Sequence, residues 1–312
     1  MATGIVLSPR YRDHDTGAGH PERPDRALAI ETRLAADGLL ESLVRIEPRA
    51  ATEADLLRCH EAAYLATARA DVAAGAERLS TGDTAISPRS LDTALLAAGG
   101  VLAAVDAVVA GHVTNAFAVV RPPGHHATPA RGMGFCLFNN VAIAARHAQQ
   151  AHGLGRVLIA DWDVHHGNGT QDIFYEDDSV YFFDTHQHPL YPGSGPATDT
   201  GRGRGLGFTR NCPFPAGAGR AEIVGAFTDL LVPAADAFRP DLVLVSAGFD
   251  SRIGDPLGDF RLTDDDFAEL TAIVRGIAER HCAGRLVATL EGGYALDGLA
   301  RAAAAHVRAL AG

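Results

Sequence analysis

The chain contains few cysteines, and they lie far apart. Its 312 residues include four, Cys59, Cys136, Cys212 and Cys282, and no two of them are close in sequence. This spacing excludes a C-x-x-C metal or redox motif. We expect reduced, mostly buried thiols in a cytoplasmic protein.

The chain also lacks a dense cluster of basic residues. It has 27 basic and 38 acidic side chains, a net charge of −11, which argues against a nucleic-acid partner. This charge suits a cationic substrate, although it is also common among soluble acidic proteins. No basic region followed by a long apolar stretch opens the sequence, and no uninterrupted apolar run approaches membrane-spanning length. We therefore expect neither a signal peptide nor a membrane partner.

Apolar residues make up 47% of the chain and charged residues 21%, which permits a sizeable core. Short apolar, β-branched runs alternate with longer Ala/Leu-rich stretches, and this alternation predicts an α/β fold with a parallel sheet covered by helices on both faces. With no linker and no internal repeat, one domain over residues 1–312 is the simplest interpretation. The expected strands are Ile5–Leu7, Leu43–Ile46, Phe117–Val120, Val157–Ala160, Val180–Phe183, Leu242–Val245 and Leu286–Leu290. The expected helices are about Arg23–Ala36, Leu91–Ala110, Val141–His152, Ala221–Phe238, Asp264–His281 and Leu296–Leu310.

Four of the expected strands run directly into polar or glycine-rich segments. Because active sites in open parallel sheets form beyond the carboxyl ends of strands, these segments are expected to converge in space. They are Arg121-Pro-Pro-Gly-His-His126, Asp161-Trp-Asp-Val-His-His-Gly-Asn-Gly169, Ser246-Ala-Gly-Phe-Asp250 and Glu291-Gly-Gly-Tyr294.

Asp163 and His165 are two residues apart, so their side chains point the same way from an extended segment. Together with Asp250 from another strand end, they suggest a three-ligand metal site with an open position, as in catalytic zinc sites. The alternative for such residues is helix capping or mutual pairing.

The tandem His125-His126 follows a turn stiffened by two prolines, which favours presentation of both imidazoles to a cleft. Tyr294 follows two glycines, and its phenol is suited to donate a hydrogen bond to a developing oxyanion. A surface histidine pair and a packed tyrosine after a Gly-Gly turn are the ordinary alternatives.

Taken together, these segments resemble the histone deacetylase branch of the arginase–deacetylase superfamily. The string Asp161–Gln171 (DWDVHHGNGTQ) is very specific, and Arg121–His126 (RPPGHH) precedes it in the expected order. Asn168 and the L-E-G-G-Y ending resemble class II deacetylases and their bacterial relatives, including acetylpolyamine amidohydrolases. Further matching segments are His14–Gly17, Gly19–Pro24, Cys59–Glu61, Gly134–Asn140, Tyr191–Gly195, Ala247–Asp250 and Leu290–Tyr294.

The resemblance implies a three-layer α/β/α fold with a mostly parallel eight-stranded sheet. It also implies one Zn²⁺ held by Asp163, His165 and Asp250, a ligand set that would accept Fe²⁺ or Co²⁺ as well. The arginase branch binds two manganese ions and carries D-x-D at the last metal motif. This chain has Asp250-Ser-Arg252, which argues for one metal and against a guanidino hydrolase.

In the family, the first histidine is backed by the aspartate matching Asp161 and the second by the residue at Asn168. A carboxylate partner favours imidazolium and an amide does not, so we expect His126 to be the general base and His125 the charged stabiliser. Tyr294 would stabilise the tetrahedral oxyanion.

The resemblance further implies a substrate channel that involves Phe135, Tyr191, Gly134, Gly293 and the rim residue Asp83. Core packing is the alternative for the two aromatic residues, and an ordinary turn is the alternative for Asp83. A structural K⁺ is implied near the zinc, with Asp161, Asp163, His165, Asp184 and Thr185 around it. Asp184 departs from the serine that is frequent in the family.

The expected activity is zinc-dependent removal of an acyl group, most simply acetyl, from an acylated lysine side chain of a protein or peptide. The alternative substrate is an acetylpolyamine or another small acylated amine, and an inactive acyl-lysine-binding scaffold is an alternative of another class. Hydroxamate inhibitors are expected to bind, and a homo-oligomer stays possible.

Overall fold

The computed structural model describes residues 2–312, and its centre is one eight-stranded sheet in the order β2-β1-β3-β8-β7-β4-β5-β6. Every neighbouring pair of strands is parallel, which confirms the expected sheet. The strands are β1 Thr3–Val6, β2 Val44–Arg45, β3 Asn115–Ala118, β4 Val157–Asp161, β5 Val180–Gln187, β6 Thr209–Phe214, β7 Leu242–Ala247 and β8 Leu286–Leu290.

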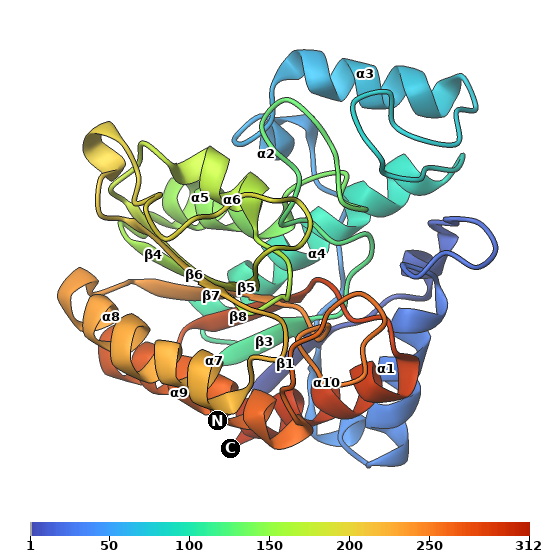
Figure 1. Cartoon of the computed structure of the whole chain (residues 1–312). Coiled ribbons are helices and arrows are strands. Elements are labelled where there is room, and N and C mark those ends of the chain that lie inside the picture. Colours follow the sequence, from blue (N-terminus) through green and yellow to red (C-terminus); the bar gives the residue numbers. More distant parts are fainter. Residues whose placement is uncertain (1) are drawn as a thin grey trace.

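Helices cover both faces of the sheet, so the molecule has three layers (Figure 1). One face carries α1 Asp25–Ala36, α7 Arg220–Ala226, α8 Val232–Phe238, α9 Asp264–Cys282 and α10 Leu296–Ala311. The other carries α2 Glu53–Leu56, α3 Ala62–Ala73, α4 Ser90–Val109, α5 Asn140–His152 and α6 Asn168–Phe174.

Two hydrophobic cores, one on each face, explain why central strands such as β4 and β7 are almost entirely apolar. Leu158 of β4 packs into the core beneath α7–α10, while its neighbour Ile159 packs into the core beneath α4 and α5. Successive side chains of a strand point to opposite faces, so a strand covered on both sides needs apolar residues at every position. All four cysteines are buried and unpaired, as expected.

Helix α4 is the one described helix that is long and apolar enough to cross a membrane by length and composition. In this fold 67% of its apolar window is buried inside the molecule. No uninterrupted apolar run of membrane-spanning length was expected there, because Asp106 interrupts the apolar residues. The apolar side chains of α4 therefore pack in the core beneath β1, β3 and β8.

The structure differs from the sequence-based expectation in several elements: helices α2, α3 and α6 and strand β6 are additional, and one expected helix is divided. Strand β6 was not expected, because Thr209–Phe214 mixes polar residues with Pro213; a proline is tolerated there since β6 is an edge strand. The single helix expected over Ala221–Phe238 is divided into α7, a π-helical turn at Phe227–Leu231 and α8. Pro233 lies in the first turn of α8 and lacks the N–H that a continuous helix would use.

The four strands that end in polar segments are β3, β8, β7 and β4, and they are consecutive in the sheet. Their carboxyl ends therefore lie side by side at one edge. The predicted convergence of these four segments is confirmed.

Candidate active site

Asp163, His165 and Asp250 form a buried group at the carboxyl ends of β4 and β7. The His165 Nδ1 atom lies 3.0 Å from Asp163 Oδ1 and 3.2 Å from Asp250 Oδ2. One donor atom from each residue lies within 4.8 Å of the other two. The three residues predicted as metal ligands are thus brought together.

The contacts of this group fit a divalent cation. Asp250 Oδ1 accepts the Val164 N–H at 2.9 Å, whereas the buried Oδ2 has no hydrogen-bond partner among residues 2–312. Tetrahedral ligation with bonds of about 2.0–2.1 Å separates ligand atoms by about 3.3 Å, close to the spacing seen here. Burial and the neighbouring Asp163 raise the pKa of Asp250 to about 7, because two carboxylates in one dry site repel each other unless a cation lies between them.

Two glycines allow the carboxylates to sit this deep. A Cβ atom on Gly292 would lie 2.0 Å from Asp250 Oδ2, and one on Gly248 would lie 2.1 Å from Asp163 Oδ2. Gly292 also donates its backbone N–H to Asp163 Oδ2 at 2.7 Å. The strand-end glycines therefore make room for the ligand group and orient it.

The histidine pair has two different environments. His125 Nδ1 lies 3.0 Å from Asp161 Oδ2, and His126 Nδ1 lies 2.8 Å from Asn168 Oδ1. Burial alone would lower the pKa of His125, but the charges of Asp163 and Asp161 outweigh it and raise this pKa well above its usual value. Burial, with the neighbouring His125, holds the pKa of His126 well below its usual value. The two rings, 4.0 Å apart, are thus suited to opposite protonation states.

Tyr294 is held by groups that the sequence analysis did not single out. The Arg26 guanidinium lies 5.0 Å from the centre of the Tyr294 ring and donates to the carbonyl oxygens of Gly293 and Glu291. Asp255 Oδ2 accepts the Tyr294 N–H at 2.7 Å. Burial, followed by the charge of Asp250, raises the pKa of the phenol well above its usual value, so the hydroxyl keeps its proton.

A buried charge network supports these loops from behind. Glu22 pairs with both Arg26 and Arg121, and all three side chains are fully buried. Glu291 Oε2 accepts the N–H groups of Gly124 and His125 at 2.6 and 3.1 Å, which ties the histidine turn to the tyrosine loop. Glu22, Arg121 and Glu291 lie inside the quoted motifs, whereas Arg26 lies outside them and had no sequence signal.

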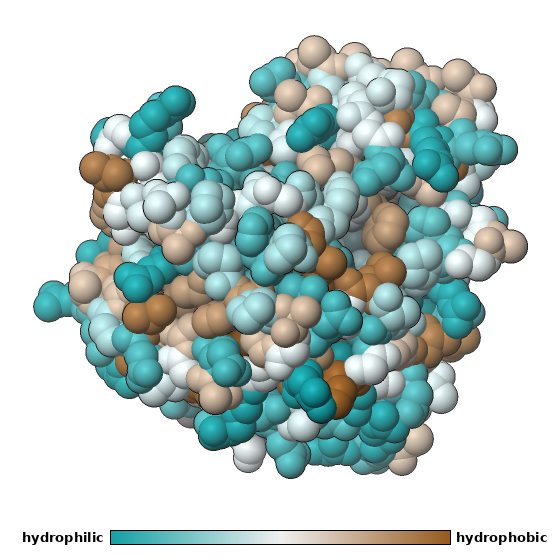
Figure 2. Space-filling view, viewed as in Figure 1, coloured by the Kyte–Doolittle hydropathy of each residue, from teal (hydrophilic) through white to brown (hydrophobic). Residues whose placement is uncertain are grey.

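A cavity of about 300 Å³ leads to the group formed by Asp163, His165 and Asp250. Most of its wall is apolar or aromatic, and Figure 2 shows apolar residues gathered near the centre of a largely hydrophilic face. Asp83 at its wall accepts the Gly134 N–H at 2.7 Å. The cavity is lined by Asp83, His126, Gly134, Phe135, His165, Leu190, Tyr191, Leu257 and Tyr294.

The expected channel residues are placed there with one exception. Phe135, Tyr191, Gly134 and Asp83 line the cavity, whereas Gly293 is buried behind it, with its carbonyl bound to Arg26. Leu190 and Leu257 are additional lining residues, which no local motif distinguishes from core leucines.

Gly134 cannot carry a side chain in this position. Its φ is +56°, and a Cβ atom would lie 2.3 Å from Cδ2 of His126. The glycine therefore lets the channel wall pass directly over the second imidazole.

Asp184 and Thr185 lie in β5 beside the end of β4 and are fully buried. Asp184 Oδ2 accepts the Gly167 N–H at 2.8 Å, and its Oδ1 lies 2.6 Å from His186 Nδ1. The Thr185 hydroxyl donates to the Asp161 carbonyl at 3.5 Å. The residues expected around a monovalent cation are therefore neighbours at the ends of β4 and β5.

A parallel three-layer fold with an Asp-His-Asp group, a histidine pair and a phenol at the strand ends defines a metal-dependent amidohydrolase. Residues 20–310 match the model of the histone deacetylase domain. The chain therefore belongs to the histone deacetylase family, and it is an amidohydrolase of that family.

Individual relatives agree with this assignment. The chain is 42% identical to a probable deacetylase of Archaeoglobus fulgidus, over 96% of this chain and 83% of that protein. It is 44% identical to the histone deacetylase-like amidohydrolase of Pseudomonas aeruginosa, over 89% and 73%. It is 45% identical to human polyamine deacetylase HDAC10, over 93% of this chain but 44% of that protein. The solved HDA15 HD domain superposes with a TM-score of 0.94 at 38% identity, covering 99% of this chain and 89% of that one.

Proposed function

We propose that the enzyme removes an acyl group, most simply acetyl, from acylated lysine side chains of proteins or peptides. The supporting observation is the apolar cavity wall that leads to the Asp-His-Asp group. An acylated lysine presents four uncharged methylenes and a neutral amide, which suit a wall built from Phe135, Leu190, Tyr191 and Leu257. Asp83, the one carboxylate among the lining residues, would accept a hydrogen bond from the peptide backbone.

The roles of the polar residues follow from their partners. Asp163, His165 and Asp250 would hold Zn²⁺, which supplies Lewis acidity that polarises the amide carbonyl and acidifies water. His126, whose pKa is low, accepts a proton from the attacking water and passes it to the leaving amine. His125, paired with Asp161, stays protonated and stabilises negative charge. Tyr294 donates its hydroxyl hydrogen bond to the developing oxyanion.

Acetylpolyamines are the second candidate substrates, because one relative is named a polyamine deacetylase. An acetylated polyamine carries an ammonium group a few methylenes from the amide. That charge would lie against Leu190 and Leu257 or reach Asp83. Burying an ammonium against leucine is costly unless a carboxylate pairs with it, so the wall favours lysine.

The test compares kcat/KM for acetyl-lysine peptides and acetylpolyamines of matched methylene length, in wild type and in Leu257→Glu. We expect wild type to prefer peptides, and the added carboxylate to shift the ratio toward polyamines; Leu257→Gln is the uncharged control. A wild-type preference for polyamines would overturn the substrate assignment. Failure to turn over either class, with metal bound, would favour the scaffold alternative.

The sequence makes this assay unusually clean. All 27 basic residues are arginine, so the chain has no lysine. An amine-reactive dye that detects the released amine therefore meets no lysine side chain of the enzyme, and the free amines of the substrate itself are subtracted with an enzyme-free blank.

We also propose a structural K⁺ at the ends of β4 and β5, bounded by Asp161, Asp163, His165, Asp184 and Thr185. The support is the burial of two carboxylates, Asp161 and Asp184, in one neighbourhood. Thermal stability should rise on replacing Na⁺ with K⁺ at constant ionic strength, and Asp184→Ser should reduce that difference. Equal melting temperatures in both salts would exclude a K⁺-selective site.

A further inference from the structure

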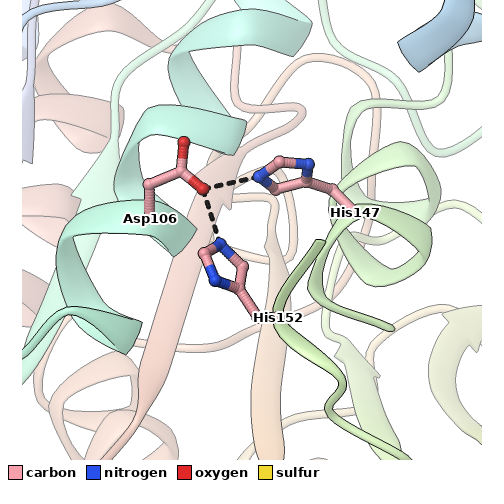
Figure 3. Close-up of side chains that lie close together, drawn as sticks. All are labelled: Asp106, His147 and His152. Carbon is pink, nitrogen blue, oxygen red and sulfur yellow. Dashed lines mark hydrogen bonds and ion pairs between the residues drawn. The ribbon is translucent and has the colours of Figure 1, made fainter. Parts of the chain in front are cut away.

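A second group of metal-ligating side chains lies outside the active site, between α4 and α5. Asp106 comes from the last turns of α4, His147 from the middle of α5, and His152 is the last residue of α5 (Figure 3). Their donor atoms lie within 4.8 Å of one another. None of the three lines the active-site cavity.

One carboxylate oxygen is shared by both imidazoles. Asp106 Oδ1 lies 2.5 Å from His147 Nε2 and 2.7 Å from His152 Nε2. Figure 3 shows both rings turned toward this oxygen. Partial burial alone would raise the pKa of Asp106, but hydrogen bonds from the two rings outweigh it and lower this pKa to about 2. The carboxylate is therefore ionised at neutral pH and faces two nitrogen donors from one helix.

We propose that Asp106, His147 and His152 form a second binding site for a divalent transition metal, with Zn²⁺ the expected ion. Two imidazoles and one carboxylate are a ligand set that suits Zn²⁺, Ni²⁺ or Cu²⁺. The side chains of Asp106 and His152 are 41% and 24% exposed, so the ion can enter from solvent and water can complete its coordination. This site does not depend on the proposed substrate.

Metal binding requires a small rearrangement of the hydrogen-bonded triad. The present spacings of 2.5 and 2.7 Å must open to about 3.3 Å to surround a tetrahedral ion. His152 is placed to move, because α5 ends at this residue and Gly153 follows in a left-handed conformation.

The positive charge of Arg58 lies beside the proposed metal site and should weaken metal binding, which provides a second test. Its NH1 group lies 2.9 Å from His147 Nδ1 and 3.0 Å from Asp55 Oδ1. When Nε2 of His147 binds a metal, its proton resides on Nδ1, so Arg58 must turn wholly to Asp55. Replacing Arg58 by glutamine removes the positive charge beside the ion and supplies an amide oxygen that can accept the His147 Nδ1 proton.

The experiment counts Zn²⁺ per chain after equilibrium dialysis at fixed free Zn²⁺, together with kcat. We expect two equivalents in wild type, one in His152→Ala with unchanged kcat, and one in Asp250→Ala. The exposed His112, replaced by alanine, is the matched control and should leave two equivalents. One equivalent in wild type, or two in His152→Ala, would overturn the second site without touching the proposed activity.

Cobalt provides an independent readout of the ligands. In the Asp250→Ala background, Co²⁺ should still give visible d–d absorption, and adding His152→Ala should abolish it. Arg58→Gln should tighten Zn²⁺ binding at this site at least threefold. Unchanged or weaker binding in that variant would refute ligation through His147 Nε2.

Discussion

Removing the hydroxyl of Tyr294 tests the proposed oxyanion role most directly. In Tyr294→Phe the ring keeps its place over Arg26 and its edge-to-face contact with Phe135, whose centre is 6.0 Å away. The backbone N–H bond to Asp255 also remains. The substitution therefore removes one hydrogen-bond donor and little else.

Losing one such donor typically costs about 2.7–4 kcal/mol of transition-state stabilisation, or about 100- to 1000-fold in kcat. Because the phenol acts on charge that develops only in the transition state, KM should change by less than about threefold.

The assay measures kcat and KM on an acetyl-lysine peptide, with the metal content of each preparation determined alongside. A variant with at least a third of wild-type kcat and a full complement of metal would refute the reasoning. A variant that loses metal would show instead that Tyr294 supports the ligand loops.

Three further predictions follow from charge and burial. Asp250→Ala should lose the active-site metal and all turnover, measured by metal analysis, while a circular-dichroism spectrum like that of wild type shows that the fold persists. Asn168→Asp should raise the pKa of His126, so the acid limb of kcat/KM, which reports loss of the neutral base as pH falls, should move to higher pH; an unmoved limb would argue against His126 as the base. His306 is buried with its pKa lowered by burial to about 3, so unfolding takes up a proton below pH 6.5 and stability falls as pH drops. At pH 5 this proton uptake lowers the free energy of unfolding by about 2 kcal/mol. The difference in unfolding free energy between pH 7 and pH 5 should therefore be smaller by about that amount in His306→Gln.

The centre of the sheet could be predicted because its strands are apolar on both faces. Runs such as Val157–Ala160 have no polar residue, and only a strand covered on both sides needs that pattern. Strand β6 was not predicted because it lies at the edge of the sheet. Arg210 can be exposed there, and Pro213 does not remove a hydrogen bond between strands. Whether a strand is apolar at every position depends on its place in the sheet, and the local sequence does not encode that place.

The candidate ligands could be predicted because each follows a strand end, and parallel strands align their carboxyl ends at one edge. The positions of Leu190 and Leu257 could not, since a leucine that lines a cavity has the same local signature as one in the core. The group formed by Asp106, His147 and His152 could not be predicted either, because its members come from two helices whose relative rotation is fixed only by packing.

The division of labour between the two active-site imidazoles comes from their partners. His125 and His126 are adjacent, equally buried and 4.0 Å apart, yet their pKa values move in opposite directions. The difference lies in the partner of each Nδ1, a carboxylate at Asp161 and an amide at Asn168. The charges of Asp163 and Asp161 together outweigh burial at His125, whereas the neutral Asn168 leaves burial and the charge of His125 to dominate at His126. A charged stabiliser and a neutral base can therefore coexist at one pH because the D-W-D-V-H-H-G-N segment places aspartate behind one ring and asparagine behind the other.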